Sequence, residues 1–185
     1  MTRLVAAVGE ELGALRGTVV GVGLVAAATG TARLLATDRP EAVVLVGTAG
    51  AYAGGPQVGT VVVVSEVLLG SAAAVLGLGY VPRAPGPIEL DTRWLGRPDL
   101  PRARVLTNLA ITTDVDLASR LGALAEVEHM EAYAVAYACA DAGVPFAAVL
   151  GITNTVGPGA HAEWLRHRLS VGASVQAVAA AWGGG

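Results

Sequence analysis

The sequence predicts a single α/β domain, in which a buried sheet is covered by helices built from small residues. Three observations support this prediction. Short β-branched runs alternate with helical segments at the spacing of α/β proteins. Hydrophobic residues make up 54% of the chain, charged residues 15% and aromatics only 4%, a balance typical of buried strands under small-residue helices. The length of 185 residues is that of one domain, which we expect to span residues 1–182, with the glycines 183–185 as a frayed tail.

The N-terminal part of the chain alternates strands with turns and helices. Leu4–Val8 is a short apolar run that a glycine ends, and the acidic pair Glu10 and Glu11 suits the positive N-terminus of a short helix. Ala42–Val46 is apolar without interruption, as expected of a parallel strand covered on both faces. Two further strands are expected at Thr18–Gly21, which leads into a glycine turn and a helix, and at the β-branched run Val58–Glu66.

Residues 68–101 show little periodicity and are rich in Gly and Pro, which predicts a long loop of the kind that forms lids or binding segments. Regular structure returns after this loop. The expected elements are a strand at Arg104–Leu109, a helix at Asp116–Leu124, a helix at Ala132–Ala142, a strand at Phe146–Ile152 and a helix at Ala162–Trp182.

Polar or glycine-rich groups follow four of the predicted strands. In an open α/β sheet, ligands bind beyond the carboxyl ends of the strands, so these groups are candidates for one site. They are Glu11, Gly21–Gly23, Gly47–Gly50 with Thr48, and Thr153–Thr155 with Asn154. Glu131, at the start of a helix, adds a second carboxylate. Such a set suits a polar, ring-bearing molecule such as a nucleoside, but it equally fits a set of turns and helix caps.

Composition disfavours several classes of function. The net charge is −3 and no stripe of Lys or Arg is present, so we expect no nucleic-acid partner. The single cysteine, Cys139, is expected in the core, and His161 and His167 lack the spacing of metal ligands on a helix, so no metal or other cofactor is expected. The apolar window at residues 17–36 is broken by glycines and Arg33, which argues against a membrane span. A cytoplasmic protein is expected.

Five motifs occur in order along the chain: G-E-E-L (9–12), V-G-V-G-L-V-A-A (20–27), V-G-T-A-G-A-Y (46–52), V-E-H-M-E-A-Y (127–133) and I-T-N-T-V-G-P (152–158), the last followed by Trp164. This ordered set resembles the nucleoside phosphorylase and nucleosidase superfamily, and within it the futalosine hydrolases. The resemblance implies a three-layer α/β/α sandwich with a mixed central sheet. It also implies an enzyme that cleaves the N-glycosidic bond of a purine nucleoside, most similar to futalosine hydrolysis to hypoxanthine in menaquinone biosynthesis.

The resemblance assigns roles to individual residues. Cleavage of the glycosidic bond develops positive charge on the ribose and electron density on the departing base. Glu11 matches the glutamate that activates the attacking water, and Glu131 matches the carboxylate that binds ribose hydroxyls, with Met130 beneath the sugar. Thr48 matches a small hydroxyl residue near the ribose. Ala49 and Gly50 match its neighbouring backbone, and Thr153 and Trp164 complete the expected substrate-binding set.

Asn154 carries information about the base. Adenine-cleaving relatives place an aspartic acid here, which can protonate the base, whereas an asparagine can donate to a ring nitrogen or a carbonyl oxygen but cannot act as an acid. The sequence therefore favours a 6-oxopurine, such as the hypoxanthine of futalosine, with Asn154 as a turn residue as the competing interpretation. The family commonly has an arginine two residues before Ile152, where this chain has Leu150.

Two other functions stay open at this point. One is a different nucleoside-cleaving activity, either methylthioadenosine/adenosylhomocysteine hydrolysis or phosphorolysis. Phosphorolysis requires a phosphate pocket with arginine, and no arginine stands near Gly21–Gly23 or Gly47–Gly50 in the sequence, which favours water as the nucleophile. The other is an inactive nucleoside-binding protein. A homodimer is expected from the resemblance, because relatives commonly complete their pockets with a neighbour's residues.

Overall fold

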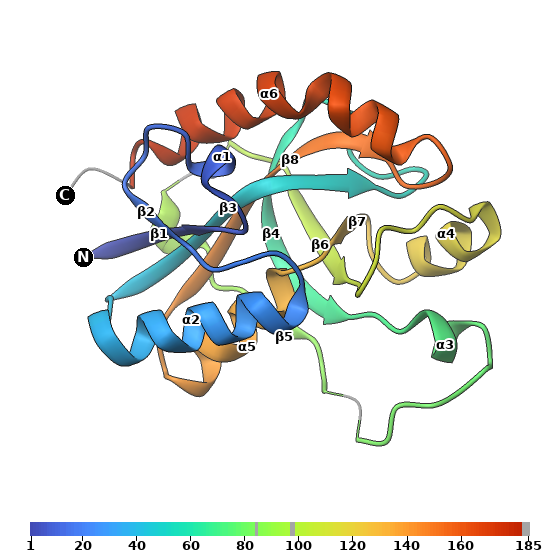
Figure 1. Cartoon of the computed structure of the whole chain (residues 1–185), viewed down its shortest axis with the longest axis horizontal. Coiled ribbons are helices and arrows are strands. Elements are labelled where there is room, and N and C mark those ends of the chain that lie inside the picture. Colours follow the sequence, from blue (N-terminus) through green and yellow to red (C-terminus); the bar gives the residue numbers. More distant parts are fainter. Residues whose placement is uncertain (84, 97–98, 183–185) are drawn as a thin grey trace.

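The computed structural model describes residues 1–83, 85–96 and 99–182, so the predicted tail at 183–185 lies outside the described residues. Within them, eight strands form one mixed sheet with helices on both sides (Figure 1). The predicted fold class, a mixed central sheet between helices, is confirmed. No helix in this part of the chain is both long and apolar enough to cross a membrane.

The elements follow the predicted order with shifted bounds. The strands are β1 (Thr2–Ala6), β2 (Gly17–Val19), β3 (Ala42–Ala51), β4 (Val61–Leu69), β5 (Ile88–Glu89), β6 (Arg102–Thr107), β7 (Val127–His129) and β8 (Phe146–Thr155). The helices are α1 (Gly9–Leu12), α2 (Leu24–Asp38), α3 (Ala72–Val75), α4 (Val115–Gly122), α5 (Ala132–Asp141) and α6 (Ala160–Ala179), with a 3₁₀ turn, η1, at Arg93–Leu95.

The sheet brings three strand ends to one edge. The strand order is β2-β1-β3-β7-β6-β4-β5, and β8 pairs with both β3 and β4. β1, β3 and β8 run parallel, so their carboxyl ends lie at the same edge. β7 runs antiparallel to β3 and thereby places the segment before α5 beside the end of β3. This edge is where the sequence predicted a site.

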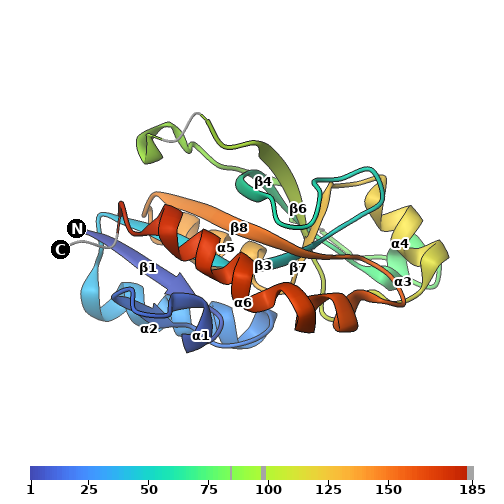
Figure 2. The same ribbon diagram turned by 90° about the horizontal axis from the view of Figure 1, so that it is seen from above.

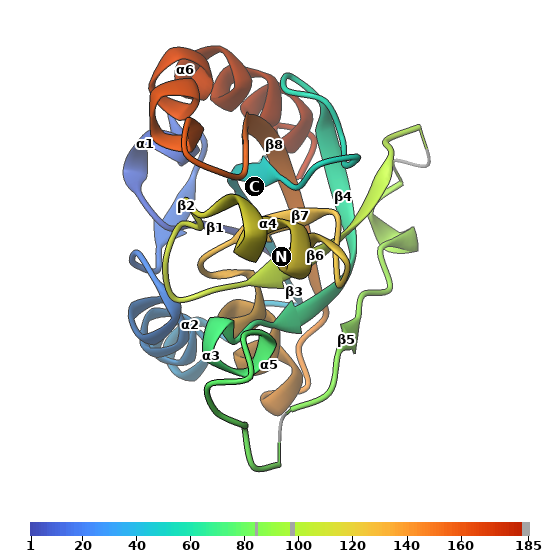
Figure 3. The same ribbon diagram turned by 90° about the vertical axis from the view of Figure 1, so that its right-hand side faces the viewer.

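The helices cover the two faces of the sheet unequally. α6 and the short α1 lie on one face, and α2 and α5 pack together on the other (Figures 2 and 3). α6 approaches β8 closely because Gly151 has no side chain: a Cβ there would lie 2.3 Å from Val171 Cγ1 and 2.7 Å from Val175 Cγ2. The small residues of the sequence therefore set the distance between the layers.

Two predictions about the strands were wrong in detail. β3 was expected to end at Val46 and β8 at Ile152, with turns to follow, but both strands continue and pair with each other as far as Ala51 and Thr155, across a register shift after Ala49. The pairing satisfies backbone groups that a turn would leave to solvent. The expected loop at residues 68–101 contains α3, β5 and η1 in its described part, and β7 was not predicted as a strand.

Candidate active site

A cavity of about 290 Å³ opens at the carboxyl-end edge of the sheet. All nine site residues predicted from the sequence line it: Glu11, Thr48, Ala49, Gly50, Met130, Glu131, Thr153, Asn154 and Trp164. They come from α1, β3, the start of α5, β8 and α6, so segments far apart in the chain meet here. Apolar side chains, among them Val8, Val22 and Ile111, form much of the remaining wall.

Glu11 is held at one end of the cavity by backbone donors. The Thr48 N–H donates to Oε1 at 3.0 Å and the Ala7 N–H donates to Oε2 at 3.2 Å. Burial raises the pKa of the Glu11 carboxyl above its ordinary value, although His129 and the Thr48 N–H oppose this shift. Gly47 makes room for the carboxylate, because a Cβ there would lie 2.9 Å from Oε1. A carboxylate with a raised pKa suits a general base.

Glu131 is the second carboxylate and is 5% exposed. Its Oε1 accepts a hydrogen bond from the Gly23 N–H at 2.6 Å, and its Oε2 lies 3.2 Å from His129 Nδ1. The sequence left open whether Gly21–Gly23 lies close to a ligand or is a plain turn. In the structure the Gly23 N–H binds the carboxylate, so the turn holds Glu131 from a distant part of the chain.

Asn154 and Thr153 lie side by side at the end of β8 and are both buried. The Thr153 hydroxyl lies 2.9 Å from Asn154 Oδ1 and 3.1 Å from the Ala49 carbonyl oxygen, and Asn154 Nδ2 donates to the Thr155 carbonyl at 3.2 Å. A Cβ at Gly50 would lie 2.8 Å from Nδ2, so this glycine admits the amide to the cavity wall. One N–H of the amide keeps no partner among these contacts.

Trp164 closes the cavity from α6. Its indole N–H donates to the Thr48 hydroxyl at 3.3 Å, and its ring stacks on His161 with centroids 5.7 Å apart. The guanidinium of Arg168 lies 5.1 Å from the indole centroid. These contacts hold the aromatic ring in place as an apolar wall against which a base or sugar can pack.

Glu128 also lines the cavity, although the sequence predicted no role for it. It accepts hydrogen bonds from the Tyr52 hydroxyl at 2.9 Å, the Asn108 amide at 2.8 Å and the Thr112 N–H at 2.9 Å. Its carboxylate raises the pKa of the Tyr52 hydroxyl together with burial, burial being the larger cause. Through these hydrogen bonds the carboxylate links β7 to the segments that carry Tyr52, Asn108 and Thr112.

The sequence favours a position for His129 at the surface or at the edge of the site. It is 6% exposed and lines the cavity, so the surface position is wrong, whereas a position at the site is not contradicted. It is buried because β7, which carries it, pairs with both β3 and β6. A three-residue strand leaves no clear periodic signal, so only its position two residues before Glu131 could have marked it. Cys139 is buried as predicted, and burial raises the pKa of its thiol to about 12, which makes it unreactive.

A smaller hollow of about 180 Å³ lies on the other side of Glu11. Arg168 lines it together with Thr48, so an arginine does approach the Gly47–Gly50 segment, contrary to the sequence-based expectation. The Arg168 guanidinium is paired with Glu10. Its charge is therefore already balanced by one carboxylate and faces a second, Glu11.

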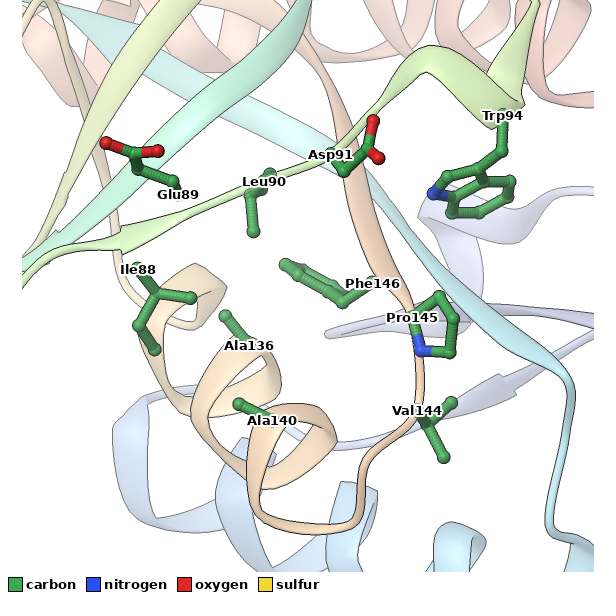
Figure 4. A pocket seen from close by; sticks show the side chains of 10 residues that line it. All are labelled: Ile88, Glu89, Leu90, Asp91, Trp94, Ala136, Ala140, Val144, Pro145 and Phe146. Carbon is green, nitrogen blue, oxygen red and sulfur yellow. The ribbon is translucent and has the colours of Figure 1, made fainter.

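A third hollow, of about 330 Å³, lies between the β5 segment and α5. Leu90, Phe146 and Ala136 point toward one another across it, whereas the carboxylates of Glu89 and Asp91 extend to the other side of the strand (Figure 4). It lacks the convergent polar groups of a ligand site. Among the described residues, no three His, Cys, Asp or Glu side chains gather as metal ligands.

Comparisons with known proteins identify the family of this chain. The family model described as the phosphorylase superfamily matches residues 13–99 and 98–182. A 5'-methylthioadenosine/S-adenosylhomocysteine nucleosidase from Exiguobacterium sp. is 32% identical over 152 residues, which cover 73% of this chain and 65% of the relative. The match thus spans about two thirds of the length of that curated protein.

Solved structures share the fold at low identity. A mutant of the Helicobacter pylori methylthioadenosine nucleosidase with 5'-methylthioadenosine in its active site superposes with a TM-score of 0.84, 15% identity and coverage of 97% of this chain and 96% of that chain. Futalosine hydrolase of Helicobacter pylori gives a TM-score of 0.82 at 14% identity, with 96% and 94% covered. At these identities the likeness concerns the fold.

Proposed function

The chain belongs to the phosphorylase superfamily, and we propose that it is an N-glycosyl hydrolase that cleaves a purine nucleoside into free base and sugar. The observation that carries this proposal is one cavity that holds two enclosed carboxylates, Glu11 and Glu131, beside the aromatic wall of Trp164 and the amide of Asn154. Its volume of about 290 Å³ is close to the range of small-molecule sites.

The arrangement supports a specific role for each of these side chains in the proposed reaction. The ribose lies against Met130 with its hydroxyls toward Glu131, which accepts hydrogen bonds that strengthen as the oxocarbenium ion forms. Glu11 takes the proton of a water whose oxygen bonds to the anomeric carbon as the carbon–nitrogen bond breaks. The bonding electrons leave with the base. Asn154 donates to the base, and the proton that finally neutralises the base comes from solvent, since an amide is no acid.

Water is the proposed nucleophile rather than phosphate. A phosphate near Glu11 would meet the carboxylates of Glu10 and Glu11, while the guanidinium of Arg168 is already paired with Glu10. These carboxylates would repel the negative charge of a phosphate and so oppose its binding. A neutral water meets no such cost, and the backbone-held carboxylate of Glu11 is an acceptor for its proton.

The leading substrate class is a 5'-methylthioadenosine or adenosylhomocysteine type of nucleoside, because the relative with 32% identity carries that name. This replaces futalosine, which the sequence motifs favoured. Futalosine stays the second candidate on one observation: position 154 is an asparagine whose Nδ2 has, among the described residues, a partner for only one N–H, and the other suits a carbonyl-bearing base. The homodimer, the cytoplasmic location and the single domain over residues 1–182 stay predictions.

The test is release of free base, followed by chromatography, from methylthioadenosine, adenosylhomocysteine, futalosine and inosine in phosphate-free buffer. Adenine from the first two supports the leading substrate, and hypoxanthine from futalosine alone supports the second. Release that requires added phosphate would contradict hydrolysis. If no base is released from any of the four, with or without phosphate, the inactive binding protein becomes the better account.

A further inference from the structure

Glu11 stands on a helix of a single turn, α1, and a helix this short is not stable by itself in water. Its Oε2 accepts from the Val8 N–H at 3.4 Å as well as from the Ala7 N–H, so the carboxylate itself satisfies backbone donors at the start of the helix. The last carbonyl oxygens of a helix have no partner within it. In α1 these include the carbonyls of Glu10 and Glu11, which depend on a donor from outside the helix.

Gln176 of α6 supplies this donor. Its Nε2 lies 3.0 Å from the Glu10 carbonyl oxygen and 3.2 Å from the Glu11 carbonyl oxygen, so one amide donates to both. Gly13 allows the approach, because a Cβ there would lie 2.6 Å from Gln176 Oε1. Its φ of 56° also favours a glycine. The end of α1 is thus capped by a side chain that stands 165 residues after Glu11.

Glu11 is therefore held at both ends of its side chain. The Thr48 N–H binds the carboxylate at 3.0 Å, and the Gln176 amide binds the backbone carbonyl. If only the carboxylate were held, α1 could shift, and the hydrogen bonds to the carboxylate would lengthen or bend. A displacement of about 1 Å at a reacting group can cost on the order of 100-fold in rate.

The second contact between α6 and α1 does not fix the backbone in the same way. Arg168 pairs with the Glu10 carboxylate, which lies at the end of a rotatable side chain. Trp164, Arg168 and Gln176 follow one another at spacings of four and eight residues, which places them on one side of α6. All three line the smaller hollow beside Glu11. Of the three, Gln176 is the residue that binds the backbone of α1.

We propose that Gln176 is a positioning residue for the nucleosidase reaction: by holding the carbonyls of Glu10 and Glu11, it sets the place of the Glu11 carboxylate relative to the water and the sugar. This inference rests on the proposed function. Glu131 and Asn154 stand at the start of α5 and on β8, so loss of the Gln176 amide moves Glu11 without moving them. The effect therefore falls on kcat rather than on KM.

The test compares variants that differ in one donor. Gln176→Met keeps the length of the side chain but removes both N–H groups, and Gln176→Lys restores a donor of similar reach. Trp182→Phe is the matched control, because it removes another side-chain N–H that donates to a distant carbonyl, that of Leu95 at 3.0 Å. We measure melting temperatures, and kcat and KM for the nucleoside that is cleaved fastest. Gln176→Met is also combined with Glu11→Gln in a double-mutant cycle.

We expect Gln176→Met to lower kcat by roughly 10- to 100-fold with KM nearly unchanged, and Gln176→Lys to recover most of the loss. In the Glu11→Gln background, Gln176→Met should change the residual rate by less than about 2-fold, because Gln176 acts through Glu11. Trp182→Phe should melt lower than the native chain but keep its kcat. Native kcat in Gln176→Met, or an equal loss with and without the Glu11 carboxylate, would overturn the inference.

Failure of the proposed function gives a different pattern. If the native chain releases no base from any nucleoside, the place of Glu11 is compared in crystal structures of the native chain and Gln176→Met. A carboxylate that leaves the Thr48 N–H in the variant supports the positioning role, and one that stays at 3.0 Å from it overturns that role. If base is released but Gln176→Met keeps native kcat, only the Gln176 inference fails.

Discussion

Replacement of Glu11 by Gln tests the mechanism most directly, because it removes the charge of the base and keeps the size of the side chain. The amide nitrogen that replaces Oε2 cannot accept from the Ala7 N–H, which costs a constant amount of stability at every pH. Gln keeps one side-chain oxygen, which can still accept from the Thr48 N–H that now donates to Oε1 at 3.0 Å. It cannot take a proton from water. Loss of a general base costs about 10²- to 10⁴-fold in kcat, which corresponds to roughly 3 to 5 kcal/mol in the barrier.

The same variant should gain stability relative to the native chain as pH rises. The folded-state pKa of Glu11 is raised above its ordinary value of 4.5, so ionisation costs more in the folded chain than in the unfolded one. The native chain therefore loses stability as pH rises through the folded pKa, by about 1.4 kcal/mol for each unit of the shift. The stability of Glu11→Gln does not fall in this way, because glutamine does not ionise.

The assay pairs base release with thermal melting between pH 4 and pH 8. We expect Glu11→Gln to be nearly inactive throughout, and its melting temperature relative to that of the native chain to rise between about pH 4 and pH 8. Native activity should fall with acidity at a pH above 4.5, the ordinary glutamate value. A variant that keeps native kcat would refute the assignment of Glu11 as a buried base, and so would a stability difference between variant and native chain that stays constant from pH 4 to pH 8.

Three further substitutions test the packing around the site. Gly47→Ala should lower kcat at least about 10-fold, since its Cβ would lie 2.9 Å from Glu11 Oε1 and push the carboxylate from its place; a variant with native kcat would show that Glu11 can move without loss. Gly151→Ala should destabilise the fold by about 1 to 3 kcal/mol in denaturant titration, because its Cβ would overlap the Val171 side chain at 2.3 Å; unchanged stability would mean that α6 shifts freely. Glu128→Leu should cost about 1 to 3 kcal/mol for each buried donor left without an acceptor, and Glu128→Gln much less; equal losses for the two would contradict the linking role of this carboxylate.

The residues of the cavity were predictable because their positions follow from local pattern. Uninterrupted apolar runs locate the buried strands, and the polar residues just after them, such as Glu11 and Asn154, must lie at the carboxyl-end edge if the strands run parallel. The ordered motifs then linked these residues to one another. Met130 and Trp164 joined the predicted set only through the resemblance to the superfamily.

The roles of the glycines needed the tertiary structure. Gly47 and Gly50 looked like turn residues, but they lie within β3, and each makes room for a side chain from elsewhere in the chain. In the sequence, a glycine that serves a turn cannot be distinguished from a glycine that allows a close contact between segments. Only the identity of the neighbouring atom distinguishes the two, and that atom comes from α1 in one case and from β8 in the other.

The sequence by itself determined the α/β class, the order of the elements and the set of residues at the edge of the sheet, because hydrophobic periodicity and turn chemistry act over a few neighbouring residues. The tertiary structure alone decided that His129 is buried, that Gly23 holds Glu131, and that Arg168 and Glu11 line one hollow. These are contacts between segments up to 158 residues apart, as in the pairing of Arg168 with Glu10. Their partners are chosen by packing of the whole fold, which no local pattern encodes.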